Sequence, residues 1–192
     1  RNAGIKNNVI GININYRLAP KHKWPSGAQD ISAAIEWTHH NEEKYNIDKE
    51  KIFLMGHSAG AAHVAAYSFD ESLQYNSGDD GVSGSILLSG IYAESSDTSK
   101  QVYYGFGKNN MPIDYLDGRS VPLFIIDAQY DKMLMQTEAI NLMRNVCKRD
   151  GTCPNHKQIP GHNHFSMMYH FNTLDDSIAP DILAFINQYT NN

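Results

Sequence analysis

A chain of 192 residues has the length of one folded domain, and its 41% hydrophobic content is enough to build a core. Its 14 glycines, 7 prolines and 19% charged residues exclude a disordered, collagen-like or low-complexity protein. A net charge of −5 without any Lys/Arg cluster makes nucleic acid an unexpected partner, and no apolar run is long enough to predict a membrane span.

Strands and helices alternate from the start of the chain. Residues 9–16 (VIGININY) are rich in β-branched side chains and end before Pro20, which predicts a first strand. From Ser26, apolar residues recur at helical spacing as far as Thr38, which predicts a helix of about four turns.

The middle of the chain continues the alternation. The apolar run 51–56 predicts a strand buried on both faces of a parallel sheet, and the alanine-rich residues 59–69 predict a helix lying close to it. Residues 83–90 and 122–127 predict two further strands. Residues 93–120 are polar, aromatic and weakly periodic, which indicates a lid or an insertion.

The last third adds a helix with an apolar stripe over 135–146, a short strand at 157–159 and a closing helix over 178–189. Such alternation predicts an α/β fold in which a mostly parallel sheet is covered by helices on both faces. We therefore expect residues 1–192 to form a single domain whose functional residues follow the carboxyl ends of the strands.

Cys147 and Cys153 are six positions apart across a turn-like segment, so a disulfide and two free thiols are equally acceptable hypotheses. A disulfide would indicate a periplasmic or secreted protein, whereas free thiols would suit the cytoplasm.

The pattern G-x-S-x-G, Gly56-His57-Ser58-Ala59-Gly60, follows the predicted buried strand and opens the alanine-rich helix. In that context it predicts a nucleophile elbow, a sharp turn that exposes a strained Ser58 above the sheet. We expect both glycines to remove side chains that would collide there, and the Ala59 N–H to bind an oxyanion. The alternative is a tight turn whose serine has no role.

A nucleophilic serine needs a base and an acid that orients the base. Asp131 lies just beyond the strand 122–127 and is favoured over Asp127, which falls inside the strand pattern. In the loop after the last strand, His164 is favoured over His162, which is nearer the glycine turn. The order Ser, Asp, His is that of α/β-hydrolases.

The block Asn15–Pro20, the elbow continued by Ala61 and His63, and the loop Gly161–Ser166 together resemble one family. They are similar to the α/β-hydrolase carboxylesterases related to hormone-sensitive lipase and to kynurenine formamidase. This resemblance covers most of the chain and implies the α/β-hydrolase fold and a serine esterase. It also implies that Arg17 and Asp30 support the elbow through a buried pairing or a capping role.

One family feature is missing. The family carries a His-Gly-Gly block upstream of the Tyr-Arg block, and its amides supply further oxyanion donors, but nothing before Asn13 resembles it. The family's preceding strand would lie between the strand ending at Tyr16 and the strand ending at Met55. We therefore expect the N-terminal strands of the fold to be absent from this chain and an upstream segment of the same protein to supply them.

The expected reaction is hydrolysis of a small acyl or aryl ester, or of a formyl amide, through an acyl-enzyme on Ser58, with His164 as base and Asp131 as acid. It requires no metal and no organic cofactor. Apolar and aromatic side chains, Tyr92 and Met133 above all, are predicted to line the substrate pocket, with ordinary core packing as an equal alternative. The full predicted wall is Tyr92, Tyr103, Tyr104, Phe106, Met111, Met133 and Met135.

Two other functions stay open. A noncatalytic binding protein with a hydrolase fold is the first, because loss of one oxyanion donor costs ~10²–10³ in rate. A metal hydrolase is the second and weaker one, because the histidines lack the spacing of a known metal motif. Its candidate ligands are His156, His162, His164 and His170.

Overall fold

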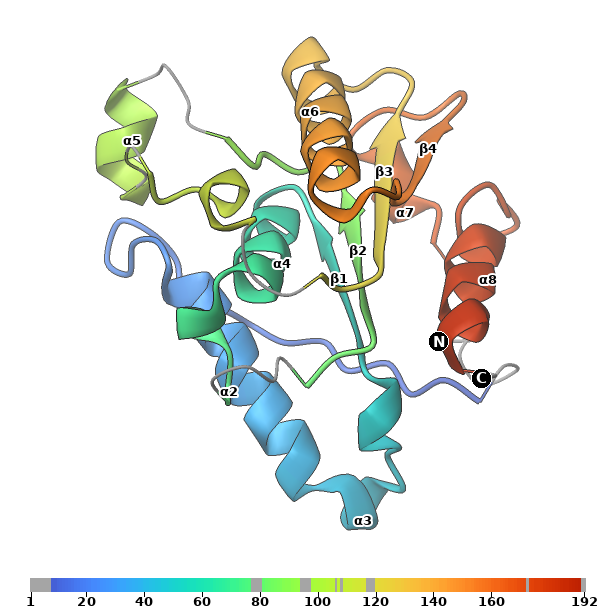
Figure 1. Ribbon diagram of the computed structural model, residues 1–192. Coiled ribbons are helices and arrows are strands. Elements are labelled where there is room, and N and C mark those ends of the chain that lie inside the picture. The colour runs from blue at the N-terminus through green and yellow to red at the C-terminus, as the bar shows by residue number, and fades with distance from the viewer. Residues whose placement is uncertain are drawn as a thin grey trace.

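The computed structural model describes residues 8–76, 81–93, 98–105, 107, 109–116, 120–171 and 173–190. At its centre lies a four-stranded parallel sheet in the order β1-β2-β3-β4 (Figure 1). The strands are β1 (Phe53–His57), β2 (Gly84–Leu88), β3 (Leu123–Ala128) and β4 (Asn155–Ile159). The four predicted strands from residue 51 onward are thus confirmed, with ends shifted by a few residues.

The predicted helices are confirmed as well. They are α2 (Ser26–His40), α4 (Ala59–Phe69), α6 (Met133–Asp150) and α8 (Ala179–Thr190). Shorter helical segments that the periodicity did not indicate are α3 (Glu42–Tyr45), α7 (Ser166–Tyr169), η1 (Lys49–Lys51) and η2 (Glu71–Leu73). Within the described ranges, no helix combines the length and apolarity needed to cross a membrane.

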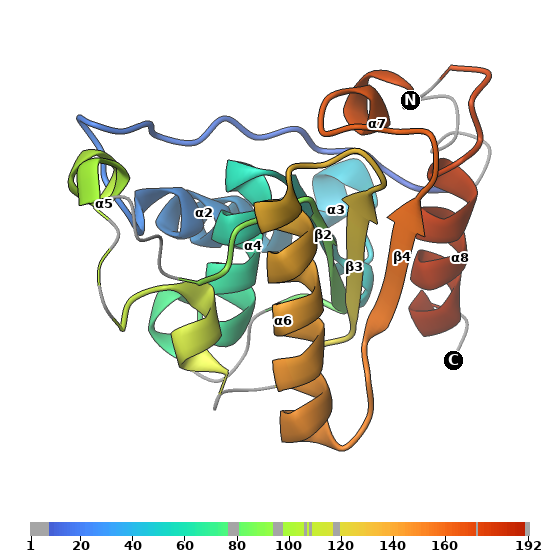
Figure 2. The ribbon, with the colours of Figure 1, turned by 90° about the horizontal axis from the view of Figure 1, so that it is seen from above.

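Helices cover both faces of the sheet, as predicted. The helices α2, α4 and α6 share one buried cluster with the sheet, and α7 and α8 share the other. Successive residues of β3 alternate between them, since Ile125 belongs to the first cluster and Ile126 to the second. Figure 2 shows α6 and α8 on opposite sides of the strands. Four fully or nearly buried alanines let α4 approach the sheet closely: Ala61, Ala62, Ala65 and Ala66.

The predicted first strand is wrong. Residues 9–16 belong to no strand, and Ile10, Ile12 and Ile14 are 55%, 46% and 40% exposed. Strand β1 is the edge of the sheet, and among the described residues only β2 lies beside it. A β-branched segment without a neighbour for its backbone N–H and C=O groups has no ladder to join.

The segment 93–120 contains two helical pieces, α5 (Thr98–Tyr104) and η3 (Pro112–Tyr115), in its described parts. The indole N–H of Trp24 donates to the Asn110 carbonyl at 2.7 Å and ties the segment to the start of α2. Its role as a lid stays a prediction.

A disulfide joins Cys147, in the last turns of α6, to Cys153, just before β4. Between them α6 ends at Gly151, whose φ of +70° is in the left-handed region that glycine adopts without strain. The bond therefore closes the turn that leads into the last strand of the sheet.

Candidate active site

The turn between β1 and α4 has the geometry of a nucleophile elbow. Ser58 has φ 55° and ψ −119°, a left-handed backbone that a non-glycine residue adopts at a cost. Its N–H donates to the Leu88 carbonyl at 2.9 Å, which fastens the elbow to the end of β2. A Cβ at position 56 would lie 2.3 Å from the Gly60 carbonyl oxygen, so Gly56 must be glycine.

The expectation for Gly60 is wrong. A Cβ built there meets nothing within 4 Å. The crowding at the elbow comes from the Gly60 backbone, which approaches Gly56, and not from the side chain that Gly60 lacks. Only the first glycine of the pattern is required by this close approach.

Ala59 is the first residue of α4, so its amide N–H has no acceptor inside its own helix. The positive end of the helix dipole lies at the same place. A developing oxyanion beside Ser58 would therefore meet one backbone donor and a favourable field.

The structure brings Asp131 and His164 together. Asp131 Oδ1 lies 3.1 Å from His164 Nδ1, although the residues are 33 positions apart. Its other oxygen accepts from the Ala128 N–H at 2.9 Å and from the Ser89 hydroxyl at 2.5 Å. These bonds orient a carboxylate whose residue is 8% exposed, and that carboxylate in turn orients the imidazole.

Ser89 is a site residue that the sequence interpretation missed. It follows β2 with φ 49°, again left-handed, and its hydroxyl also contacts Met167 Sδ at 3.0 Å. A serine at the carboxyl end of a strand, next to the strands that carry the elbow and the acid, was the available signal.

Ser58 Oγ and His164 make no hydrogen bond in this structure. The ring centroids of His57 and His164 nevertheless lie 4.5 Å apart, so the predicted base stands beside the residue that precedes the predicted nucleophile. Burial, and after it the charge of His164, lowers the pKa of His57. A lowered pKa disfavours a positive charge on His57 next to the predicted base. Serine–histidine contacts in ligand-free enzymes are often long and shorten when substrate binds.

The competing residues have other partners. Asp127 accepts from His156 Nε2 and from Gln158 Nε2, both at 2.7 Å, and is 1% exposed. His162 faces the hydroxyls of Ser166 and Ser177. Because His156 and His164 contact two different carboxylates, the four histidines of the metal-hydrolase hypothesis do not form one cluster.

The predicted pocket residues differ in their exposure to solvent. Tyr92 is 0% exposed and lies in the core, which corrects its assignment to the pocket. The reason is a buried carboxylate: Glu138 on α6 accepts from the N–H groups of Tyr92 and Ala93 at 2.9 and 2.8 Å and draws this segment inward. Met133, by contrast, is 81% exposed at the start of α6.

The other members of the predicted wall divide in the same way. Met111 is 0% and Met135 9% exposed, so both are core residues, whereas Tyr104 is 42% exposed. The side chain of Tyr103 and all of Phe106 lie outside the described residues.

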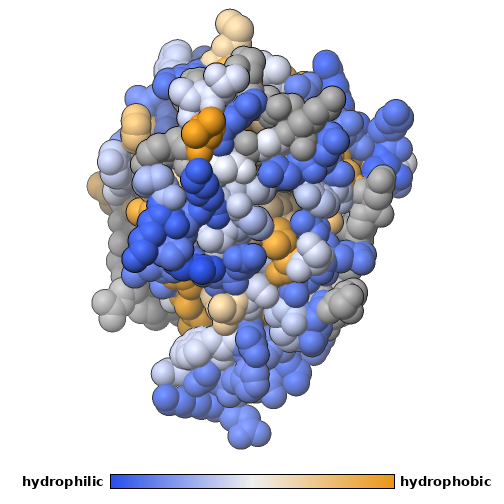
Figure 3. Space-filling view, turned by 90° about the vertical axis from the view of Figure 1, so that its left-hand side faces the viewer, coloured by the Kyte–Doolittle hydropathy of each residue, from blue (hydrophilic) through white to orange (hydrophobic). Residues whose placement is uncertain are grey.

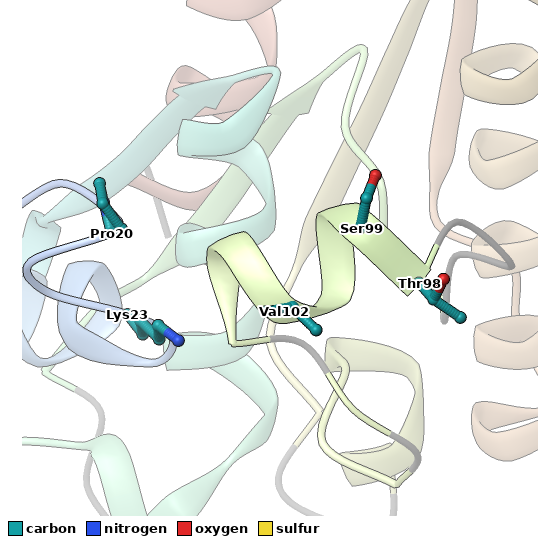
Figure 4. A pocket seen from close by; sticks show the side chains of 5 residues that line it. All are labelled: Pro20, Lys23, Thr98, Ser99 and Val102. Carbon is teal, nitrogen blue, oxygen red and sulfur yellow. The ribbon is translucent and has the colours of Figure 1, made fainter.

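A cavity of about 560 Å³ opens between the turn after Pro20 and helix α5 (Figure 4). Pro20 and Lys23 line it from the turn, and Thr98, Ser99 and Val102 from α5. Neither Tyr92 nor Met133 belongs to this lining.

On the face of the molecule shown in Figure 3, hydrophilic side chains predominate and the visible apolar ones form small separate groups.

The expected pair of Arg17 and Asp30 is present. Arg17 Nε lies 2.8 Å from Asp30 Oδ1, and its backbone N–H donates to Oδ2 at 2.7 Å. The Arg17 side chain is 47% exposed, so the pair is a surface one and not buried. It joins the N-terminal segment to α2, which packs against α4 behind the elbow.

Comparison with known proteins places this geometry in context. A family model described as an alpha/beta hydrolase fold matches residues 5–117, more than half of the chain. The chain is 28% identical to Esterase LipQ of Mycobacterium tuberculosis over 68% of its own length and 36% of that protein. It is 46% identical to an arylesterase of Saccharolobus solfataricus over 30% of its own length and 19% of that protein.

Solved structures agree on the fold. EstE1, a thermostable carboxylesterase cloned from a metagenomic library, superposes with a TM-score of 0.78 at 18% identity. The match covers 97% of this chain and 70% of EstE1. The chain thus spans about a third of LipQ and a fifth of the arylesterase, the curated relatives that it matches.

Proposed function

The chain belongs to the alpha/beta hydrolase fold family, and on that premise we propose that it carries the catalytic residues of a carboxylesterase. Ser58 is the nucleophile, His164 the general base and Asp131 the acid that orients it. The observation that carries this proposal is the hydrogen bond between Asp131 and His164. It lies beyond the carboxyl ends of the strands, as does the strained Ser58 turn.

The reaction has two halves. Ser58 Oγ attacks the ester carbonyl carbon while His164 Nε2 takes its proton, and the oxyanion that forms accepts from the Ala59 N–H. The intermediate then expels the alcohol, which receives the proton from His164, and leaves an acyl group on Ser58. Water attacks this ester, passes a proton to His164, and the carboxylic acid departs with Ser58 restored.

The contact between Asp131 and His164 supports this division of roles. Since Nδ1 of the imidazole faces the carboxylate, Nε2 is the nitrogen left to exchange protons with Ser58. The carboxylate favours the imidazolium that forms transiently, and burial disfavours a second positive charge on the half-buried His57 beside it.

The substrate that we propose is a small acyl or aryl ester, with a formyl amide as the other acyl donor. Met133, exposed at the start of α6 close after Asp131 in the chain, is a predicted pocket residue that remains accessible. Relatives named esterase and arylesterase support an ester, and a relative named arylacetamide deacetylase keeps the amide as the alternative.

The disulfide between Cys147 and Cys153 supports an oxidising compartment, periplasmic or secreted, for the whole protein. Thiol alkylation of freshly lysed cells, followed by mass measurement, tests this. Protection of both cysteines supports the assignment, and alkylation of both contradicts it.

The test of the function uses the full-length protein with p-nitrophenyl esters of graded chain length and with formyl-kynurenine. Ser58→Ala should reduce turnover by at least about 10⁴-fold, because the acyl-enzyme can no longer form. Ser72→Ala, a change at an exposed serine of η2, serves as the matched control and should retain full activity.

A fluorophosphonate probe gives an independent result. Mass mapping should locate the adduct on Ser58 in wild type and find none in the Ser58→Ala variant. Turnover unaffected by that substitution, or labelling at another residue only, would remove the enzyme proposal and leave a noncatalytic binding protein.

A further inference from the structure

A second histidine cluster lies in the loop that carries the proposed base. His162, His170 and Asp175 each offer one possible ligand atom, and these atoms all lie within 4.8 Å of one another. Asp175 Oδ2 is 3.2 Å from His162 Nε2 and 2.7 Å from His170 Nδ1. Two imidazoles thus converge on one carboxylate oxygen.

Two other polar atoms of the cluster have partners outside it. His162 Nδ1 lies 3.2 Å from the Ser166 hydroxyl, and Asp175 Oδ1 accepts from the Ser177 N–H at 2.9 Å. Metal-binding imidazoles and carboxylates are oriented by this kind of outer hydrogen bond on the atom that does not bind the metal. His162 Nε2 also lies 2.9 Å from the Ser177 hydroxyl, a contact that a bound metal would have to displace.

The cluster is partly enclosed and lies beside a small cavity. His162 is 5% exposed, and a cavity of about 10 Å³ adjoins the cluster. Its lining is His170, Phe171, Asp175, Ser177, Ile178 and Ala179. This is about the space of a single water-sized particle, so it suits an ion or a water and excludes an organic ligand.

We propose that His162 Nε2, His170 Nδ1 and Asp175 Oδ2 form a binding site for a divalent transition metal, of which Zn²⁺ is the best match. Two imidazole nitrogens and one carboxylate oxygen are ligands that Zn²⁺ accepts, and water can complete a tetrahedron. The Asp175 charge offsets part of the charge of the ion.

The site is separate from the proposed catalytic residues. His164 is two residues from His162, but its Nδ1 faces Asp131 and takes no part in the cluster. A bound metal would connect the loop before α7 to the segment after it, since Asp175 and Ser177 precede α8. Its role is to fix the loop that carries the base.

The experiment uses tag-free, full-length protein treated with a chelator, and the metal alone as the probe. Calorimetric titration with Zn²⁺ should show one equivalent bound per chain, and Co²⁺ should give visible d–d bands of a low-coordinate site. His170→Ala and Asp175→Asn should each weaken binding more than 100-fold, because each removes a ligand. Ser166→Ala should weaken it about 10–100-fold, as loss of an outer partner does.

The matched control is His40→Ala, an exposed histidine in the last turn of α2, which should bind as wild type. His170 and Asp175 have side chains 48% and 29% exposed, and Asp175→Asn keeps the size of the side chain. Circular dichroism of each variant before titration separates loss of a ligand from loss of fold. No bound equivalent in wild type, or undiminished affinity in folded His170→Ala and Asp175→Asn, overturns the proposal.

Discussion

Two regions of the molecule differ sharply in how many partners their residues have. Asp131, in the loop after β3, makes three separate hydrogen bonds, with Ser89 after β2, with Ala128 at the end of β3 and with His164 in the loop after β4. Residues 9–16 have the stronger β-strand pattern but join no ladder, and their isoleucines are exposed. In this structure the predicted strand thus joins no sheet, and the candidate site lies at the ends of strands that do.

The comparison shows that a segment forms a β-strand only where a neighbouring strand is available for its backbone hydrogen bonds. The loops are fixed because they follow strands whose own neighbours are present, so their side chains meet at one sheet edge. The segment 9–16 has no such neighbour, and its hydrophobic side chains cannot replace one.

The N-terminal segment from Tyr16 to Trp24 makes more side-chain contacts than the described residues before it. Arg17 pairs with Asp30, and the rings of Tyr16 and Trp24 both pack on that of His63, with centroids 4.8 and 5.4 Å away. Since His63 belongs to α4, this packing joins the segment to the helix that begins at the elbow.

The largest effect should come from the acid. Asp131→Asn keeps the shape of the side chain but loses the charge and favours the wrong imidazole tautomer, so kcat should fall about 10⁴-fold. Ester hydrolysis by the full-length protein measures this. Asp127→Asn alters the other buried aspartate, which contacts His156, and should leave kcat within about threefold. Equal losses in both variants would contradict the assignment of the acid.

The next effect concerns the stability that Glu138 on α6 provides by binding the segment after β2. Glu138→Ala leaves two buried N–H groups, of Tyr92 and Ala93, without an acceptor and should lower the free energy of unfolding by about 3 kcal/mol. Urea denaturation measures the loss. Glu36→Ala, at an exposed position of α2, should stay within about 0.5 kcal/mol of wild type. A loss below 1 kcal/mol in Glu138→Ala would show that water satisfies these amides.

A smaller effect should appear with pH in the packed part of the N-terminal segment. Burial lowers the pKa of His63 to about 4, against 6.5 in the unfolded chain. Because the unfolded state takes up this proton first as pH falls, stability declines from pH 6.5 downward and the loss is complete below pH 4. Between pH 7 and pH 5 the wild type should lose about 2 kcal/mol more than His63→Gln, which lacks the titrating group.

Free energies of unfolding of both proteins, measured at several pH values, test this dependence. Curves that run parallel between pH 7 and pH 5 would mean that His63 is protonated in the folded protein. The rings of Tyr16 and Trp24 would then pack on a cation.

The smallest effect should come from the exposed isoleucines. In the 192-residue chain, Ile12→Ala should change the free energy of unfolding by less than about 0.5 kcal/mol, because that side chain is 46% exposed. Ile126→Ala, the same change at a fully buried strand position, should cost about 3 kcal/mol. A cost at Ile12 close to that at Ile126 would mean that residues 9–16 pair with a strand after all.

Local patterns were sufficient to predict most of the fold. Four strands and four helices follow from apolar runs and helical spacing, because each of these elements has a neighbour to cover the face that the pattern marks. The segment 9–16 failed the same rule, since the pattern records a preference for a sheet and contains no information on whether a partner strand is available.

The candidate site divides in a similar way. The elbow could be predicted because a strand, a turn and a helix are contiguous in sequence, and Asp131 and His164 follow from chain order. Ser89 and the inward position of Tyr92 could not, since each depends on one distant carboxylate, Asp131 and Glu138 respectively.

By itself, then, the sequence determined the alternation of strands and helices, the strained serine turn and the identity of the residues able to act as acid and base. Only the tertiary structure decided which histidine faces which carboxylate: His164 faces Asp131, while His162 and His170 face Asp175. The physical reason is the distance along the chain over which each interaction acts. Backbone preference and hydrophobic period act over a few neighbouring residues, whereas a hydrogen bond between side chains more than 30 positions apart exists only once the strands beneath them have paired.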